Sequence, residues 1–245
     1  MPPSRATPTR TADNVAPVAV RALVFDVFGT LVDWRGGVTA AFAASGIDGD
    51  PAELSDDWRA RYAPALEDVN RGARSWSTLD DLHRATLDEL LADRGIAGVD
   101  EDTRATLVQA WHRLDPWPDV REGLEQLRRR HVTATLSNGH VALLIDLARH
   151  GDLRFDAILS AELAGAYKPA PQAYLTAARL LGVAPQEVML VAAHPSDLAG
   201  ARAAGLRTAF IDRPEEHGAG SSQRSDPEAD VSAGSLPELA ERLAG

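Results

Sequence analysis

The 245-residue sequence contains no cysteine and only one lysine, Lys168, beside 24 arginines. The absence of cysteine excludes disulfide bonds, thiolate metal sites and cysteine nucleophiles. No hydrophobic run approaches the roughly 20 residues that a membrane-spanning helix requires, so we expect no membrane partner. All the other Lys or Arg positions hold arginine, so the single lysine suggests a specific role for Lys168.

Positive charge is also scarce, since 25 Lys and Arg stand against 36 Asp and Glu and the formal net charge is -11. A nucleic-acid-binding protein would need a basic surface, so we expect no nucleic-acid partner. Hydrophobic residues make up 44% of the chain, which is enough to bury a core. The composition therefore predicts a globular enzyme, and we expect it to be cytoplasmic.

The chain is expected to contain a leader, a core and an inserted helical region. Residues 1–18 are rich in Pro, Thr, Arg and Ala without hydrophobic periodicity, which favours a disordered leader over a transit peptide. The hydrophobic run at 20–25 predicts a strand that is buried on both faces. Between 38 and 114, hydrophobic residues recur at helical spacing, and this pattern predicts several amphipathic helices.

From residue 119 onward, expected helices alternate with expected strands. Strands are expected at 132–136, 157–159, 188–191 and 208–211, helices at 120–130, 141–150, 172–181, 198–204 and 236–243, and a polar loop at 214–228. This alternation predicts an α/β fold with a doubly wound, Rossmann-like parallel sheet formed by residues 19–36 and 117–245. Residues 37–116 would then form a helical cap subdomain inserted after the first strand.

Polar side chains follow four of the hydrophobic runs that are expected to form strands. A single residue of this kind would usually be a helix cap or part of a turn. In an open parallel sheet, however, ligands bind beyond the carboxyl ends of the strands, so four sets at that edge predict a catalytic site. The sets are Asp26 and Thr30, then Ser137 and Asn138, then Lys168 across a short loop, and finally His194, Ser196 and Asp197.

Four short motifs resemble those of the haloacid dehalogenase superfamily. They are FDVFGTL at 25–31, LSNG at 136–139, YKP at 167–169 and AAHPSD at 192–197. The resemblance covers about residues 20–213 and includes the position of the helical cap. It implies a Rossmann-like core in which Asp26 is the nucleophile.

Within that superfamily, the sequence is similar to the L-2-haloacid dehalogenase (type II) branch. The phosphatases of the superfamily carry a second aspartate two positions after the nucleophile and use Mg²⁺, because phosphoryl transfer needs a cation. Here that position holds Phe28, and the fourth motif supplies only one acidic residue, Asp197. The dehalogenase branch works without metal, so we expect no metal and no cofactor.

The resemblance implies (S)-2-haloacid dehalogenase activity on small 2-haloalkanoic acids or haloacetates. Asp26 is ionised at neutral pH and would displace the halide by SN2 attack, forming an aspartyl ester. Water would then hydrolyse the ester and release a 2-hydroxy acid. The preferred chain length and the displacement of fluoride stay open.

The resemblance also implies roles for individual residues of the core. Thr30 would orient Asp26, with a helix-capping role as the competing interpretation. Lys168 would hydrogen-bond the nucleophile and help to bind the substrate carboxylate, while Asp197 would position Lys168 and the hydrolytic water. Phe28 would line the substrate site, Ser137 would donate to the substrate carboxylate, Asn138 would lie on the halide side, and Tyr174 would lie near the site or pack in the core.

The cap is expected to supply an arginine that binds the halide. Trp58-Arg59 resembles the family's Trp-Arg pair, so Arg59 is the expected residue, with Arg61 as the alternative and a solvated helix face as the simplest interpretation. His194 stands where relatives often have asparagine. It could donate hydrogen bonds, or it could assist the water that hydrolyses the ester.

Two other functions stay open at this point. A phosphatase with an atypical Mg²⁺ site would depend on added Mg²⁺, and a catalytically silent family member would form no adduct at Asp26. Lys168 and Asp197, retained together with Asp26, argue against a silent member. Relatives are commonly homodimers, so we expect this chain to form a homodimer. The small molecule that it binds is expected to be a 2-haloacid substrate.

Overall fold

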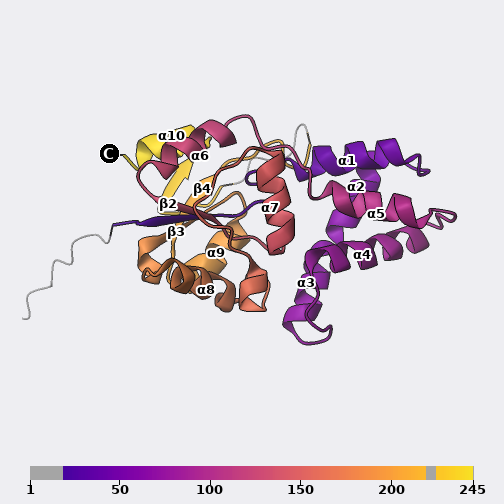
Figure 1. The fold of residues 1–245 in the computed structure, drawn as a ribbon, viewed down its shortest axis with the longest axis horizontal. Coiled ribbons are helices and arrows are strands. Elements are labelled where there is room, and N and C mark those ends of the chain that lie inside the picture. Colours follow the sequence, from indigo (N-terminus) through magenta and orange to yellow (C-terminus); the bar gives the residue numbers. More distant parts are fainter. Residues whose placement is uncertain (1–18, 219–224, 245) are drawn as a thin grey trace, which may run out of the picture.

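The computed structural model describes residues 19–218 and 225–244, so the expected leader at 1–18 lies outside the described residues. Its centre is a parallel five-stranded sheet with the strand order β2-β1-β3-β4-β5 (Figure 1). This arrangement confirms the expected α/β fold. The strands are β1 (Ala22–Phe25), β2 (Val132–Thr135), β3 (Val188–Ala192), β4 (Arg207–Ile211) and β5 (Val231–Ala233).

Helices cover both faces of the sheet because both faces of its strands are hydrophobic. Along β1, Leu23 and Phe25 belong to one buried cluster and Ala22 and Val24 to another, as the alternation of side chains along a strand requires. Figure 1 shows a pair of helices on each side of the sheet. The pairs are α6 (Val120–Arg128) with α10 (Leu236–Arg242), and α8 (Pro171–Leu181) with α9 (Pro195–Ala203).

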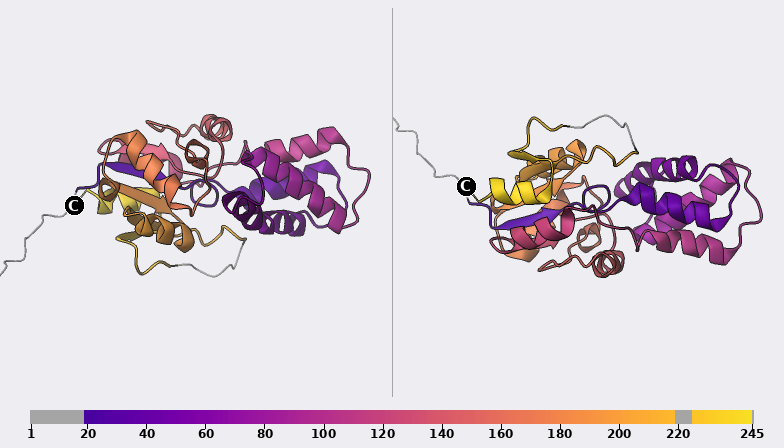
Figure 2. Two further views of the ribbon diagram at one scale, coloured as in Figure 1. Left: turned by 90° about the horizontal axis from the view of Figure 1, so that it is seen from below. Right: turned by 90° about the horizontal axis from the view of Figure 1, so that it is seen from above.

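Five helices form the cap, which is inserted between β1 and α6 and lies to one side of the sheet (Figures 1 and 2). They are α1 (Trp34–Ser45), α2 (Pro51–Ala60), α3 (Tyr62–Asn70), α4 (Leu79–Asp93) and α5 (Glu101–Ala110). Four of them begin at a residue whose side chain accepts a backbone N–H of the first turn, namely Asp33, Asp50, Thr78 and Asp100. These caps satisfy donors that the helix itself leaves unpaired.

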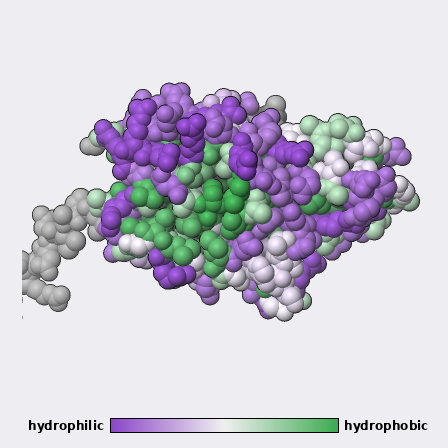
Figure 3. All heavy atoms as spheres, viewed as in Figure 1, coloured by the Kyte–Doolittle hydropathy of each residue, from purple (hydrophilic) through white to green (hydrophobic). Residues whose placement is uncertain are grey.

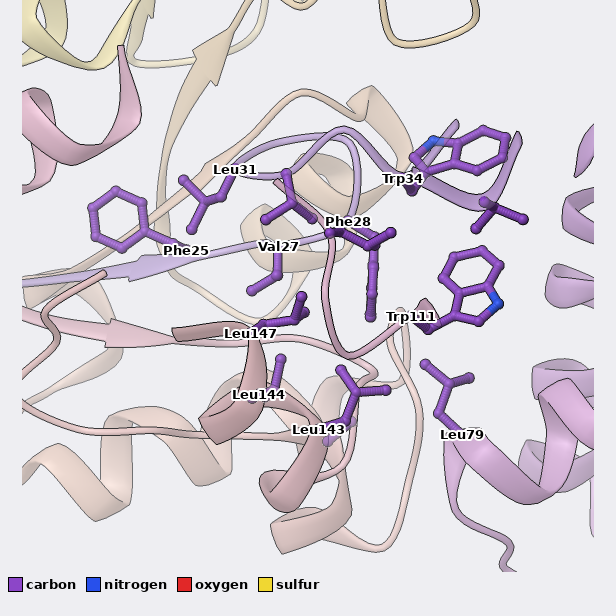
Figure 4. Packing of buried hydrophobic residues seen from close by; sticks show 14 of the residues in the cluster. Phe25, Val27, Phe28, Leu31, Trp34, Leu79, Trp111, Leu143, Leu144 and Leu147 are labelled. Atoms are coloured by element: carbon purple, nitrogen blue, oxygen red, sulfur yellow. The ribbon is translucent and has the colours of Figure 1, made fainter. Parts of the chain in front are cut away.

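A buried group of aromatic rings joins the cap to the core (Figure 4). Trp34 stacks on Trp111 with the ring centroids 6.2 Å apart, and Phe28 meets the same indole edge-on at 5.8 Å. Leu143 of α7 (Val141–His150) belongs to the same cluster from the core side. Each ring pair adds about 0.5–1.5 kcal/mol beyond the burial of its area. This packing holds the cap over the carboxyl edge of the sheet.

The expected strand at 157–159 is wrong. The segment runs beside β2 but forms only isolated bridges with its neighbours. The hydroxyl of Thr135 donates to the carbonyl of Leu159 (2.8 Å) and accepts from its N–H (3.0 Å), so a side chain takes the place of a backbone ladder. The short strand β5 has only three residues, too few for a recognisable hydrophobic pattern, and the sequence did not indicate it.

One surface of the core is rich in exposed hydrophobic side chains, which we call the α7–α8 surface. Figure 3 shows hydrophobic residues gathered where Figure 1 draws α7 and α8. Its members are Ile145 on α7, Leu163 on the 3-10 helix η1 (Ala161–Ala164), and Leu175 and Leu180 on α8, each 40–46% exposed.

Within the described ranges, no helix is long and hydrophobic enough to cross a bilayer.

Candidate active site

The carboxyl ends of β1, β2 and β3 bring the expected catalytic residues together. Asp26 directly follows β1, and its backbone N–H donates to the carbonyl of Val191 in β3 (3.0 Å). Asn138 lies just beyond β2, whereas His194 and Asp197 lie beyond β3, the latter in the first turn of α9. Because these strands are parallel and adjacent, the four side chains share one edge of the sheet.

Asp26 is buried and receives three hydrogen bonds from side chains. Its Oδ1 accepts from Lys168 Nζ (2.9 Å), and its Oδ2 accepts from the Thr30 hydroxyl (2.7 Å) and lies 3.1 Å from His194 Nδ1. Burial alone would raise the pKa of Asp26, but the Lys168 ammonium and the hydrogen bond from His194 outweigh it and hold that pKa well below its usual range. The carboxylate is therefore ionised and fixed in place.

The Lys168 ammonium is surrounded by three oxygen acceptors. Nζ donates to Asp26 Oδ1, to the carbonyl of Leu136 (2.8 Å) and to Asp197 Oδ2 (2.5 Å). Burial acts to lower the pKa of Lys168, but the carboxylates of Asp197 and Asp26 prevail and raise it. Asn138 holds the backbone of this residue, because its Oδ1 accepts from the Lys168 N–H (2.8 Å).

Asp197 is held by two donors. Tyr174 donates from its hydroxyl to Asp197 Oδ1 (2.6 Å), while Lys168 donates to the other carboxylate oxygen. Burial and the nearby Asp26 raise the pKa of Asp197, although Lys168 acts in the opposite direction. Tyr174 is fully buried and does not line the cavity in front of Asp26. Its contact with Asp197 places it behind the site.

His194 connects the nucleophile to Glu216, a residue that the sequence did not single out. His194 Nε2 lies 2.9 Å from Glu216 Oε1, which also accepts from the Trp34 indole N–H (3.1 Å). Burial acts to lower the pKa of His194, but the hydrogen bonds with Asp26 and Glu216 raise it to about 9. Glu216 lies in the stretch expected to be a polar loop, so no local pattern marked it.

Gly29 gives Glu216 the space to reach His194. The glycine has a φ of +82°, and a Cβ built on it would lie 2.2 Å from Glu216 Oε1. Any other residue would therefore be strained at this φ and would collide with the carboxylate. The glycine of the first motif thus makes room for a residue 187 positions later in the chain.

A cavity of about 740 Å³ opens in front of Asp26, and Arg59 of α2 lines it. The guanidinium lies 4.0 Å from the centre of the Tyr62 ring, and its Nη1 is buried and has no hydrogen-bond partner among the described residues. A buried, unpaired cationic donor is costly unless an anion completes it. Arg61 instead pairs with Asp93 (3.0 Å) and lines a different cavity.

Of the expected core residues, Phe28, Asn138, Lys168, His194 and Asp197 line this cavity with Asp26. Thr30 and Ser137 are fully buried and are not on its wall. The Thr30 hydroxyl accepts from the Ala193 N–H (3.0 Å) while it donates to Asp26. The Ser137 hydroxyl accepts from the Gly139 N–H (3.2 Å). Its expected role as a donor to the substrate carboxylate stays a prediction.

The chain belongs to the haloacid dehalogenase-like hydrolases, whose family it matches over residues 20–205. Among curated relatives, (S)-2-haloacid dehalogenase 1 of Pseudomonas sp. (strain CBS-3) is 34% identical over 207 residues, which are 81% of this chain and 88% of the relative. A crystal structure of an L-2-haloacid dehalogenase is 47% identical, with a TM-score of 0.87 over 92% of this chain and 99% of the other. A defluorinating L-2-haloacid dehalogenase is 42% identical, with a TM-score of 0.88 over 92% of this chain and 96% of the other.

We expect Lys168→Arg to lose activity although the charge is kept. A planar guanidinium cannot place one nitrogen within hydrogen-bond distance of the three acceptors that surround Nζ, and a misplaced donor near the reacting atoms costs roughly 100-fold in rate. Steady-state kinetics would measure the loss, and circular dichroism would check the fold. Arg128→Lys, an exchange on an exposed helix face, is the matched control. Full activity of Lys168→Arg would contradict the specific need for an ammonium.

Proposed function

We propose that this chain is an (S)-2-haloacid dehalogenase that works in the cytoplasm, as a homodimer, on small 2-haloacids. The observation that carries the proposal is the pairing of an ionised Asp26 with a cavity that the cationic side chain of Arg59 lines. A substrate of this class has a carboxylate and a halogen on one carbon. It therefore needs a nucleophile, a carboxylate partner and a cation for the departing halide.

In the first step, a carboxylate oxygen of Asp26 attacks the α-carbon from the side opposite the halogen. The new C–O bond forms an aspartyl ester, and the electrons of the carbon–halogen bond leave with the halide. Arg59 is placed to receive the anion, because its side chain lines the cavity. Phe28 supplies an apolar surface for the substrate carbon.

In the second step, water attacks the ester carbonyl carbon, Cγ of Asp26. The bond between Cγ and the ester oxygen breaks, and the 2-hydroxy acid leaves with that oxygen and takes up a proton. Alkylation removes the negative charge of Asp26, which is one of the two groups that raise the pKa of His194. The pKa of His194 then falls, so the imidazole can lose its proton and accept one from the attacking water. Glu216 keeps the ring oriented through Nε2.

The donors around the cavity also support a proposal on the leaving group. A relative 42% identical to this chain is described as a defluorinating enzyme. Fluoride leaves only when strong donors stabilise it, and Arg59 brings a guanidinium to the wall of the cavity. We therefore include fluoroacetate among the substrates.

A phosphatase is the second candidate, and the side chains at the site disfavour it. Lys168 Nζ lies between the carboxylates of Asp26 and Asp197 and donates to both. Phe28 offers no oxygen ligand, whereas Mg²⁺ prefers an octahedron of oxygens. The donor set fits an ammonium better than a divalent metal.

The first test measures halide release from chloroacetate, fluoroacetate and both enantiomers of 2-chloropropionate in the presence of EDTA. We expect release from the L but not the D enantiomer, with D-lactate as product, because backside attack inverts the carbon. Asp26→Asn should reduce the rate of halide release by roughly 10⁴-fold or more, as loss of a nucleophile does. Asp152→Asn, at an exposed position, is the control. Phosphate release that requires Mg²⁺, without halide release, would instead support the phosphatase.

His194→Gln tests the role of the imidazole in the second step. We expect a burst of about one halide per active site, followed by turnover slowed roughly 10²–10⁴-fold, the usual contribution of a general base. Rapid-quench measurements would show the burst, and intact-protein mass spectrometry would show the accumulated ester. Slow release without a burst would place His194 in the first step.

The raised pKa of His194 also predicts a pH dependence of kcat/KM, which reports on the free enzyme. Below about pH 9 the imidazolium can donate to both Asp26 and Glu216. Above about pH 9 the neutral imidazole of His194 keeps only one N–H, which cannot donate to both carboxylates. We therefore expect kcat/KM to fall as the pH rises through this value. In His194→Gln this descending limb should be absent; its persistence would assign the limb to another group.

The homodimer is proposed to form through the α7–α8 surface, where a second copy would cover the exposed leucines. A two-fold axis pairs a hydrophobic patch with itself, so one patch is sufficient. We expect the wild-type chain to be dimeric and Leu175→Glu/Leu180→Glu to be monomeric by light scattering coupled to size-exclusion chromatography. Gln172→Glu, which adds charge at an exposed position of the same helix, should stay dimeric. A monomeric wild-type chain, or a dimeric double variant, would contradict this assignment.

A further inference from the structure

A second cluster of polar side chains lies at the junction of the cap and the core, away from Asp26. It consists of Asp80 at the start of α4, His112 just after α5, and His140 and Asp146 at the start and in the middle of α7. None of the four lines the active-site cavity. Two of the elements belong to the cap and one to the core, so the cluster bridges the two parts.

Three of these residues present ligand atoms at distances that suit a tetrahedral metal ion. The Asp80 carboxylate lies 3.0 Å from His112 Nε2 and 3.6 Å from His140 Nε2, and the three ligand atoms all lie within 4.8 Å of one another. A tetrahedral ion with bonds of 2.0–2.2 Å separates its ligand atoms by about 3.3–3.6 Å. The distance from Asp80 to His112 is shorter than this range, and the distance from Asp80 to His140 lies at its upper end.

The surroundings also resemble those of a metal site. His112 Nδ1 lies 2.8 Å from the Asp146 carboxylate, and such a contact keeps the proton on Nδ1 when Nε2 gives up its own to a metal. The His112 side chain is 7% exposed and that of His140 11%, while Asp80 is 27% exposed and leaves an approach from solvent.

We propose that Asp80, His112 and His140 bind a divalent transition-metal ion of the zinc class, with water as the fourth ligand, and that this ion fastens the cap to the core. Two imidazoles and one carboxylate are ligands that zinc accepts. Asp146, behind His112, supplies a second negative charge beside the ion. Binding replaces the proton that His112 Nε2 shares with Asp80, and this proton is released to solvent.

The ion would act on the position of the cap and take no part in the chemistry. It ties α4 and the end of α5 to α7, which are otherwise joined here by the packing of Trp111 and its neighbours. A ligand that binds only the folded chain raises its stability. We therefore expect higher thermal stability with metal and nearly unchanged kcat at temperatures at which the metal-free chain is folded.

The test uses the full chain after treatment with EDTA and removal of the chelator. We expect Zn²⁺ to bind at one equivalent in isothermal titration calorimetry and to raise Tm, and Co²⁺ to give the visible absorption of a tetrahedral site. His140→Asn and Asp80→Asn should abolish both signals. His150→Asn, on the same helix but paired with Asp115 outside the cluster, should keep them.

Asp146→Asn distinguishes a metal site from a simple ion-pair network. Loss of a carboxylate behind a ligating histidine weakens metal binding about 10–100-fold without removing a ligand, so Co²⁺ should still bind, with a higher Kd. No binding of Zn²⁺ or Co²⁺ to the wild-type chain would overturn the proposal, and so would equal binding by wild type and His140→Asn. The cluster would then be only a network of hydrogen bonds across the junction.

Discussion

The active site depends on one buried ammonium shared by two carboxylates. Asp26 and Asp197 could not both stay ionised so close together in a buried site without a cation between them. Lys168 supplies that cation and reaches both at 2.9 and 2.5 Å. The desolvation of these charges is costly, so their positions must be fixed by other contacts, which come from Thr30, Asn138 and Tyr174 on different elements.

The core and the cap make different contributions to the site. The core supplies the nucleophile and the groups that keep it ionised. Asp26 and His194 lie beyond the ends of β1 and β3, and Lys168 comes from the loop before α8. The cap supplies Arg59 and the aromatic wall around it, so the cavity exists only where the two parts meet. The packing of Phe28, Trp34 and Trp111 across this junction therefore matters for chemistry as well as for stability.

The contact between His194 and Glu216 fixes the imidazole beside the nucleophile. An imidazole has two nitrogens on opposite sides of the ring, so one can face Asp26 while the other is held from behind. Glu216 provides that support, Trp34 of the cap fixes Glu216, and Gly29 leaves it space. The position of His194 thus depends on three further residues from distant parts of the chain.

Much of the fold and the site could be predicted from local patterns. The alternating core, the helical insertion, and Asp26, Lys168 and Asp197 at the ends of hydrophobic runs were readable because strand ends carry their polar residues at short range in sequence. Tertiary structure decided the rest. It placed Arg59 rather than Arg61 in the cavity wall and brought Glu216 beside His194, and it replaced the expected strand at 157–159 by side-chain hydrogen bonds from Thr135. Contacts between residues so far apart in sequence leave no periodic signal, because only the packing of the complete chain brings them together.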